Sequence, residues 1–188
     1  MRLPEQFISR MQRELGVVEA EALCAALETE PSTSVRLNPA KMAEQKWGGG
    51  RVAWSDYGYL LGERPAFTLD PDFHAGAYYV QEASSQFAGY IVSMAVGGAE
   101  ACKGQRVLDM CAAPGGKSTH YATLVGERGL VVANEINRSR AAVLADNARK
   151  WGLGNMVVTC NDSAHLGDYE EWFDVVAIDA PCSGEGMF

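Results

Sequence analysis

The sequence has few cysteines, and none of them is paired in a motif. There are five in 188 residues, an odd number, and no two form a C-x-x-C pair. The odd count without such a pair disfavours a disulfide framework, the missing pairs give no support to a zinc site, and no metal is predicted. Unpaired thiols fit a reducing compartment, and we expect the protein in the cytoplasm. The five are Cys24, Cys102, Cys111, Cys160 and Cys182.

Long hydrophobic runs are also absent. No stretch is apolar for long enough to span a bilayer, and the N-terminal segment MRLPEQFISRMQREL is amphipathic and charged, unlike a secretion signal. With 47% hydrophobic residues, the chain can bury one substantial core and a smaller appended unit. A soluble protein is therefore expected.

Positive charge is scarce. The formal net charge is -8, which argues against nonspecific nucleic-acid binding through bulk charge. Between Thr33 and Arg64 there are five basic and three acidic residues, so the net charge of this segment is five minus three, or +2, in an otherwise acidic chain. A solvated face is the simpler explanation of so small an excess, and a local basic surface stays open.

Two common nucleotide-binding loops are missing. The dinucleotide fingerprint G-x-G-x-x-G does not occur, and a P-loop would need a glycine where Cys111 stands. These absences disfavour dehydrogenases and ATPases. The chain has instead RVLDMCAAPGGK at residues 106–117, where a buried-strand pattern runs into Pro114, Gly115 and Gly116. Such small residues let the backbone approach a ligand at a helix N-terminus.

The residue pattern of the first part of the chain, residues 1–98, predicts a small α+β unit that is a possible RNA-binding region. Its helices and strands are short, and Gly16 weakens the first helix enough to predict a kink or a helical hairpin. The expected helices are residues 4–28 and 83–96, and the expected strands are residues 34–38, 51–54 and 57–61.

The second part, residues 99–188, alternates strand and helix patterns. This alternation predicts a parallel sheet with right-handed crossovers, a Rossmann-like α/β fold. Ligands of such sheets bind beyond the carboxyl ends of the strands. An acid follows each of four predicted strands, and together these acids favour a site, although each alone fits a turn acid or a helix cap. They are Asp109, Glu135, Asp162 and Asp179.

The motifs around these acids resemble a known family, the cytosine-C5 RNA methyltransferases of the NOL1/NOP2/Sun group, which use S-adenosyl-L-methionine (SAM). Within it, the chain is most similar to the bacterial RsmF type. The resemblance therefore implies a 16S rRNA or small-ribosomal-subunit partner. The matching segments are DMCAAPGGK (109–117), NE (134–135), ND (161–162) and DAPCSGEG (179–186), with RLNP (36–39) and HAGAYYVQEASS (74–85) upstream.

The resemblance also implies roles for individual residues. Glu135 would accept the ribose hydroxyls of SAM and Asp162 would meet the adenine amino group. Asp179 would adjoin the cofactor and hydrogen-bond the cytosine, and Lys117 would pair with nearby acids. The methionine part of SAM would lie against the loop Cys111, Ala112, Ala113, Pro114, Gly115, Gly116 and Lys117.

The role of Cys182 depends on the enzyme class. Methylation at cytosine C5 needs a thiolate that adds to C6, followed by removal of the C5 proton. DNA cytosine methyltransferases use the cysteine of a Pro-Cys motif as the nucleophile, whereas the RNA family uses a later cysteine and the Pro-Cys one assists product release. The resemblance gives Cys182 the release role and places the nucleophile beyond Phe188. The fourth predicted strand would also be an unpaired edge, so we expect either an N-terminal fragment that is inactive alone or another segment that supplies the remaining strands.

Two other functions stay open. A DNA cytosine-C5 methyltransferase would make Cys182 the nucleophile, and a noncatalytic assembly factor would bind SAM or RNA without methyl transfer. Several residues have simpler structural interpretations: Cys111 as a packed small residue, and His120 and His165 as structural histidines. Four aromatic residues of the first part fit a core better than base stacking. They are Trp47, Trp54, Tyr57 and Tyr59.

Overall fold

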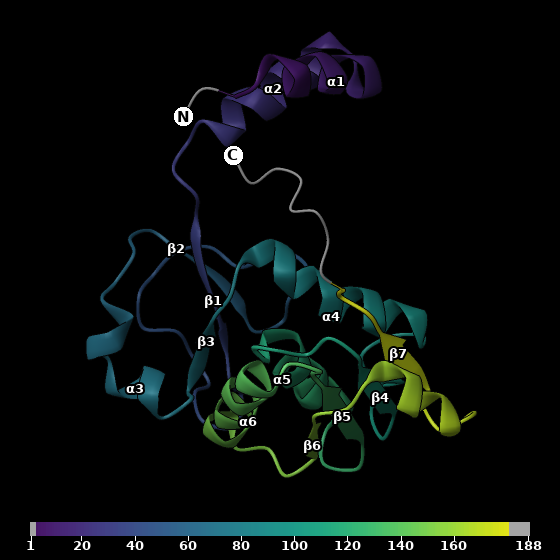
Figure 1. Ribbon diagram of the computed structural model, residues 1–188. Coiled ribbons are helices and arrows are strands. Elements are labelled where there is room, and N and C mark those ends of the chain that lie inside the picture. Colours follow the sequence, from purple (N-terminus) through teal and green to yellow (C-terminus); the bar gives the residue numbers. More distant parts are fainter. Residues whose placement is uncertain (1–2, 181–188) are drawn as a thin grey trace. The chain divides into compact units, whose positions relative to one another are not determined.

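The computed structural model describes residues 3–180 (Figure 1). Contacts between residues separate the N-terminal residues up to Ser32 from a compact unit of Thr33–Pro181. In the first unit, α1 (Glu5–Leu15) and α2 (Val17–Leu27) contact each other. Gly16 separates them with a φ of +84°, a left-handed conformation that favours glycine. The predicted break at Gly16 is confirmed.

The second unit begins with a three-stranded antiparallel sheet in the order β2-β1-β3. Its strands are β1 (Thr33–Leu37), β2 (Gly58–Leu61) and β3 (Tyr78–Val80). The prediction of a strand at residues 51–54 is wrong, because only Arg51 forms an isolated bridge there, to Tyr59. The sequence also missed β3 and the helices before it, η1 (Phe67–Leu69) and α3 (Pro71–His74).

The predicted Rossmann-like sheet follows and is confirmed as parallel, in the order β6-β5-β4-β7. The alternation of elements matches the prediction, with ends that differ by a few residues. In chain order they are β4 (Arg106–Asp109), α5 (Gly116–Val125), β5 (Leu130–Asn134), α6 (Arg138–Trp151), β6 (Met156–Thr159), η2 (Ser163–Asp168) and β7 (Val175–Ala177).

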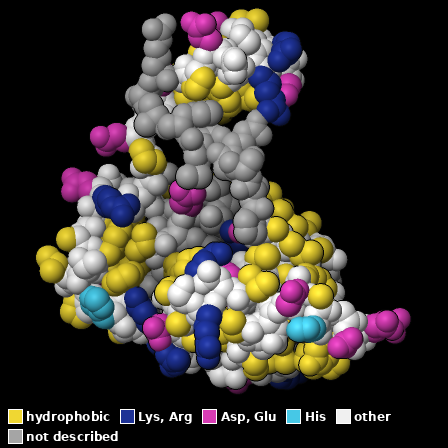
Figure 2. All heavy atoms as spheres, viewed as in Figure 1, with side chains coloured by type: hydrophobic (Ala, Val, Ile, Leu, Met, Phe, Trp, Pro, Cys, Tyr) yellow, Lys and Arg dark blue, Asp and Glu magenta, His cyan; other side chains and the backbone are white. Residues whose placement is uncertain are grey.

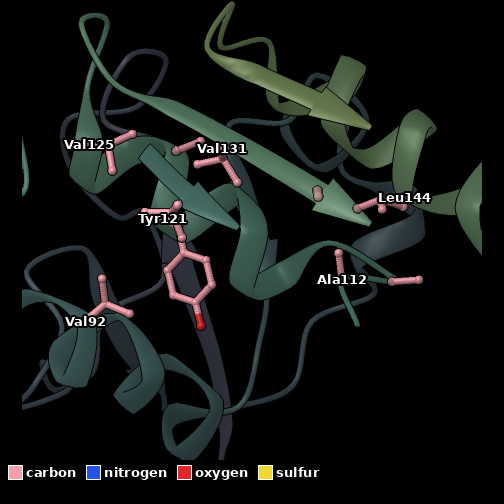
Figure 3. Close-up of a cluster of buried hydrophobic side chains, with 10 residues drawn as sticks. Val92, Ala112, Tyr121, Val125, Val131 and Leu144 are labelled. Carbon is pink, nitrogen blue, oxygen red and sulfur yellow. The ribbon is translucent and has the colours of Figure 1, made fainter. Parts of the chain in front are cut away.

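The core of this sheet joins residues from strands, helices and the loop after β4. Val131 of β5 and Leu144 of α6 are fully buried, and Tyr121 of α5 is 3% exposed. Figure 3 shows these side chains together with Val92 of α4 (Ala83–Ala95) and Ala112 of the loop. Burial of apolar side chains from each element fixes the carboxyl end of β4 relative to the helices.

Helix α4 connects the two sheets. It contacts β1 and β2 of the antiparallel sheet as well as α5 of the parallel one, so both sheets belong to one compact unit. The domain boundary expected after residue 98 stays a prediction. Among the described residues, no helix is long and apolar enough to cross a membrane.

Part of α4 and β7 presents hydrophobic side chains to solvent. In the described chain β7 is an edge strand, as predicted for the fourth strand. Figure 2 shows hydrophobic atoms gathered over this region. The exposed residues are Phe87, Tyr90, Ile91 and Met94 on α4, and Val176 and Ile178 in and after β7.

Candidate active site

The glycine-rich loop joins the end of β4 to the start of α5. Gly115 has a φ of +109° and caps α5, and a Cβ there would lie 3.0 Å from Leu144 Cδ1. A Cβ on Gly116 would lie 3.3 Å from both Gln81 Nε2 and Tyr79 Cε1. The Ala113-Pro114 bond is cis. The fold leaves little space for a side chain at either glycine, so bare backbone lies at the N-terminus of α5.

A cavity of about 230 Å³ opens above this loop. The loop forms one side, and β3 with the residues after it forms the other, so both sheets contribute. Most of the predicted cofactor residues line it, and Gly115, which is not among the lining residues, caps α5. The lining residues are Tyr79, Val80, Gln81, Glu82, Ser85, Asp109, Cys111, Ala112, Ala113, Pro114, Gly116, Lys117 and Asp179.

Lys117 and Asp179 meet at this cavity. Parallel pairing of β4 with β7 brings the two strand ends together, and Lys117 Nζ lies 2.7 Å from Asp179 Oδ2. Asp109, at the end of β4, is 2% exposed and accepts a hydrogen bond of 2.7 Å from the Ser118 hydroxyl. Burial raises the pKa of Asp109, and the hydrogen bond from Ser118 opposes that shift. The site therefore contains a partly exposed ion pair, Lys117–Asp179, and a buried carboxyl group, that of Asp109.

The Cys111 thiol is a poor nucleophile in this setting. Burial raises its pKa, and the negative charges of Asp109, Glu135 and Asp179 raise it further. A thiol with a raised pKa stays protonated at neutral pH, and the thiolate is the reactive form. This electrostatic environment favours the interpretation of Cys111 as a packed lining residue.

Glu135 and Asp162 do not line the cavity, although both follow strands as predicted. Glu135 is 3% exposed, accepts a hydrogen bond from the backbone N–H of Asn137 and lies 3.3 Å from Arg140 Nη1. Arg140 also donates to the carbonyl of Ala113, so Glu135 is tied to the glycine-rich loop. Asp162 is exposed and accepts a hydrogen bond from Ala164 N at the start of η2.

Arg36, which has no role among the residues predicted from the sequence, reaches the loop from β1. Its side chain is fully buried, and Nε donates to Gln81 Oε1 at 2.9 Å. Nη2 donates to the carbonyl of Gly116 at 3.0 Å and to Thr119 Oγ1 at 2.7 Å. Desolvation lowers the pKa of Arg36 to about 9, which still leaves the guanidinium charged at neutral pH. A charged group of the antiparallel sheet thus holds the first turn of α5.

The remaining predicted residues have varied placements. Cys182 lies outside the described residues, so its role stays a prediction. His120 is buried against Gly89 of α4, where burial lowers its pKa well below the usual range. His165 is exposed in η2. Of the four candidate stacking aromatics, Trp47, Tyr57 and Tyr59 pack against the core of the antiparallel sheet, as the simpler interpretation predicted.

Comparison with known proteins agrees with this geometry. Residues 3–83 match the family described as the N-terminal domain of 16S rRNA methyltransferase RsmF, and residues 100–188 match 16S rRNA methyltransferase RsmB/F. The chain is 34% identical over 198 residues to ribosomal RNA small subunit methyltransferase F of Vibrio cholerae, covering 98% of this chain and 41% of that protein. The protein of the same name from Erwinia tasmaniensis is 34% identical over 199 residues, with the same coverage.

A solved structure also matches. The crystal structure of a methyltransferase homologue from Pyrococcus horikoshii has a TM-score of 0.77 and 26% identity, covering 98% of this chain and 65% of that one. The chain spans about two fifths of the length of the curated relatives. The two sequence families together match nearly all of the chain, and the chain belongs to the RsmB/F family of 16S rRNA methyltransferases.

Proposed function

We propose that this chain forms the SAM-binding part of an enzyme that methylates C5 of cytosine in 16S rRNA. The observation that carries the proposal is the cavity that joins the bare backbone of Gly116 to the Lys117–Asp179 ion pair. Bound SAM would supply the methyl group. Free thiols at Cys24, Cys102, Cys111 and Cys160 support a cytoplasmic protein.

The described residues fit SAM in three ways. The loop backbone at the start of α5 is open to the cavity, so N–H groups without intrahelical partners can bind a carboxylate. Each oxygen of Glu135 has accepted one partner and retains capacity for a ribose hydroxyl. Asp162 would accept from the adenine amino group, because its carboxylate is exposed at the start of η2.

The cytosine would lie against Asp179. Lys117 holds that carboxylate beside the cavity, so Asp179 can accept a hydrogen bond from the base while the lysine stabilises its negative charge. Cys182, three residues later, keeps its proposed role in product release. A cysteine other than Cys182 would supply the nucleophilic thiolate.

The test is transfer of labelled methyl from SAM by the full-length protein, offered unmodified small ribosomal subunits, transfer RNA and DNA. Digestion to nucleosides should give label in 5-methylcytidine from 16S rRNA alone. Label in DNA would indicate the alternative in which Cys182 attacks the base. SAM binding without any transfer would indicate the noncatalytic assembly factor.

A further inference from the structure

A second cavity of about 350 Å³ lies beside the candidate active site, between α6 and the segment from η1 to β3. Of the site residues predicted from the sequence, none that the structure describes lines it. Its volume is in the range of small-molecule pockets, which start at about 300 Å³. The side chains that define it are Arg64, Phe73, Tyr79, Asn147, Lys150 and Trp151.

The two cavities share a wall. Tyr79 and Val80 line both of them. Asn147 donates a hydrogen bond of 2.8 Å to the carbonyl of Pro114 in the glycine-rich loop, and its amide lies 3.4 Å from the Tyr79 hydroxyl. An RNA strand that enters the candidate active site would therefore pass next to the second cavity.

The second cavity combines aromatic walls with positive charge. Lys150 Nζ lies 3.5 Å from the centroid of the Phe73 ring, and the Arg64 guanidinium lies 5.7 Å from the centroid of Phe67. Within residues 3–180, neither cation forms an ion pair with a carboxylate. Figure 2 shows Lys and Arg side chains among hydrophobic ones over α6. In a chain of net charge -8, two cations without a carboxylate partner among the described residues favour the binding of an anionic ligand.

Aromatic faces with adjacent cations suit one ligand chemistry. A nucleobase stacks on an aromatic ring or packs against it, and its phosphate pairs with Lys or Arg. A metal ion would need carboxylate, thiol or imidazole ligands, none of which lines this cavity. The Asn147 amide adds a donor that can contact a base edge or a ribose.

We propose that the second cavity binds one unpaired nucleotide of the RNA substrate, next to the target cytosine. The base lies against Phe73 and Tyr79, and its phosphate contacts Lys150 and Arg64. This inference rests on the proposed function for the identity of the polymer. It adds a specificity site for the neighbouring nucleotide, built from the antiparallel sheet region and α6.

The first experiment uses the full-length protein and a single-stranded RNA oligonucleotide. The variants Lys150→Gln and Arg64→Gln should each weaken RNA binding about tenfold at low salt and lower the salt dependence of binding by about one phosphate contact. The KM for RNA should rise by a similar factor with kcat within about twofold, and the Kd for SAM should be unchanged. Arg128→Gln is the matched control, because Arg128 is exposed before β5 and lines neither cavity.

A photocrosslink gives a second readout that does not depend on activity. RNA carrying a single 5-iodouridine beside the target cytosine should attach to the peptide that contains Phe73 or Tyr79, and Phe73→Leu should reduce the yield. Equal RNA affinity in Lys150→Gln, Arg64→Gln and wild type, with intact methylation by wild type, would overturn the inference alone. Binding that depends on Lys150 without any methylation of RNA would overturn the proposed function and leave the nucleotide site standing.

Discussion

Arg36 Nη2 donates a hydrogen bond to the Thr119 hydroxyl at 2.7 Å, across 83 residues of sequence. The same guanidinium lies 4.4 Å from the centroid of the Trp151 ring and binds the carbonyl of Gly116. Three elements, β1, α5 and α6, therefore meet at one buried cation. The position of the glycine-rich loop depends on the antiparallel sheet as well as on the Rossmann-like sheet.

Arg36→Lys should destabilise the protein and weaken SAM binding together. A lysine keeps the charge but cannot make the same set of fork-shaped contacts, so buried acceptors at Gly116 and Gln81 lose donors. We expect a loss of about 2–4 kcal/mol in the free energy of unfolding, measured in urea. Arg128→Lys, on an exposed loop, should change it by less than about 0.5 kcal/mol. Unchanged stability of Arg36→Lys would show that the contacts with α5 are dispensable.

Gly115→Ala should disturb the loop through both backbone and packing. The φ of +109° disfavours any side chain, and the added Cβ would lie 3.0 Å from Leu144 in the core. A destabilisation of about 1–3 kcal/mol is expected, with a weaker Kd for SAM by isothermal titration. Gly62→Ala is the matched control, because a Cβ there meets nothing within 4 Å. Equal effects of the two substitutions would contradict the role given to Gly115.

Asp109→Asn should change how stability depends on pH. Burial raises the folded-state pKa of Asp109 above its ordinary value of 3.8, so the folded state binds the proton more tightly than the unfolded state does. The contribution of this carboxyl is present below pH 3.8 and is lost as pH rises through the folded-state pKa. Relative to Asp109→Asn, the wild type should therefore lose free energy of unfolding as the pH rises above 3.8. Urea denaturation across that range checks the sign, and a relative gain with rising pH would refute it.

The pattern of apolar residues was sufficient to predict the parallel sheet, but it did not predict β3, which forms one side of the cavity at the glycine-rich loop. Strands such as β5 have a continuous run of apolar residues, which a reading of the local sequence recognises. Strand β3 has only three residues and is recognised only by its pairing with β1, which is a long-range event. Arg36 was also missed as a functional residue, because a charged side chain in a short strand usually faces solvent. Its acceptors lie more than forty residues away.

The placement of acids at strand ends was predictable, and their side-chain directions were not. Asp109 and Asp179 face the cavity, whereas Glu135 turns back to the N–H of Asn137. That direction depends on the local turn after β5, which the strand pattern does not specify. For the same reason the pairing of Glu135 with Arg140 could not be read from the sequence.

Asp179→Asn should reduce methyl transfer far more than stability. The Lys117–Asp179 pair is partly exposed, so its contribution to stability is about 1 kcal/mol or less. If Asp179 contacts the cytosine, the loss in kcat should be about 100-fold or more, at an unchanged Kd for SAM. Asp146→Asn provides the control, because Asp146 pairs with Arg149 on the exposed surface of α6. A decrease in kcat below tenfold would remove Asp179 from the reacting site.

Glu135→Gln and Arg140→Gln together separate a cofactor contact from a structural one. If Glu135 accepts the ribose hydroxyls, Glu135→Gln should weaken SAM binding by about 1.5–3 kcal/mol, since hydrogen bonds to a charged group are lost. Arg140→Gln removes the ion pair and the bond to the carbonyl of Ala113 but leaves the carboxylate free for ribose. It should therefore weaken SAM binding much less. Equal losses in the two variants would mean that Glu135 acts only by holding Arg140 against the loop. Adenosine, which keeps the ribose but lacks the methionine part, should then bind to Glu135→Gln and to the wild type with equal affinity.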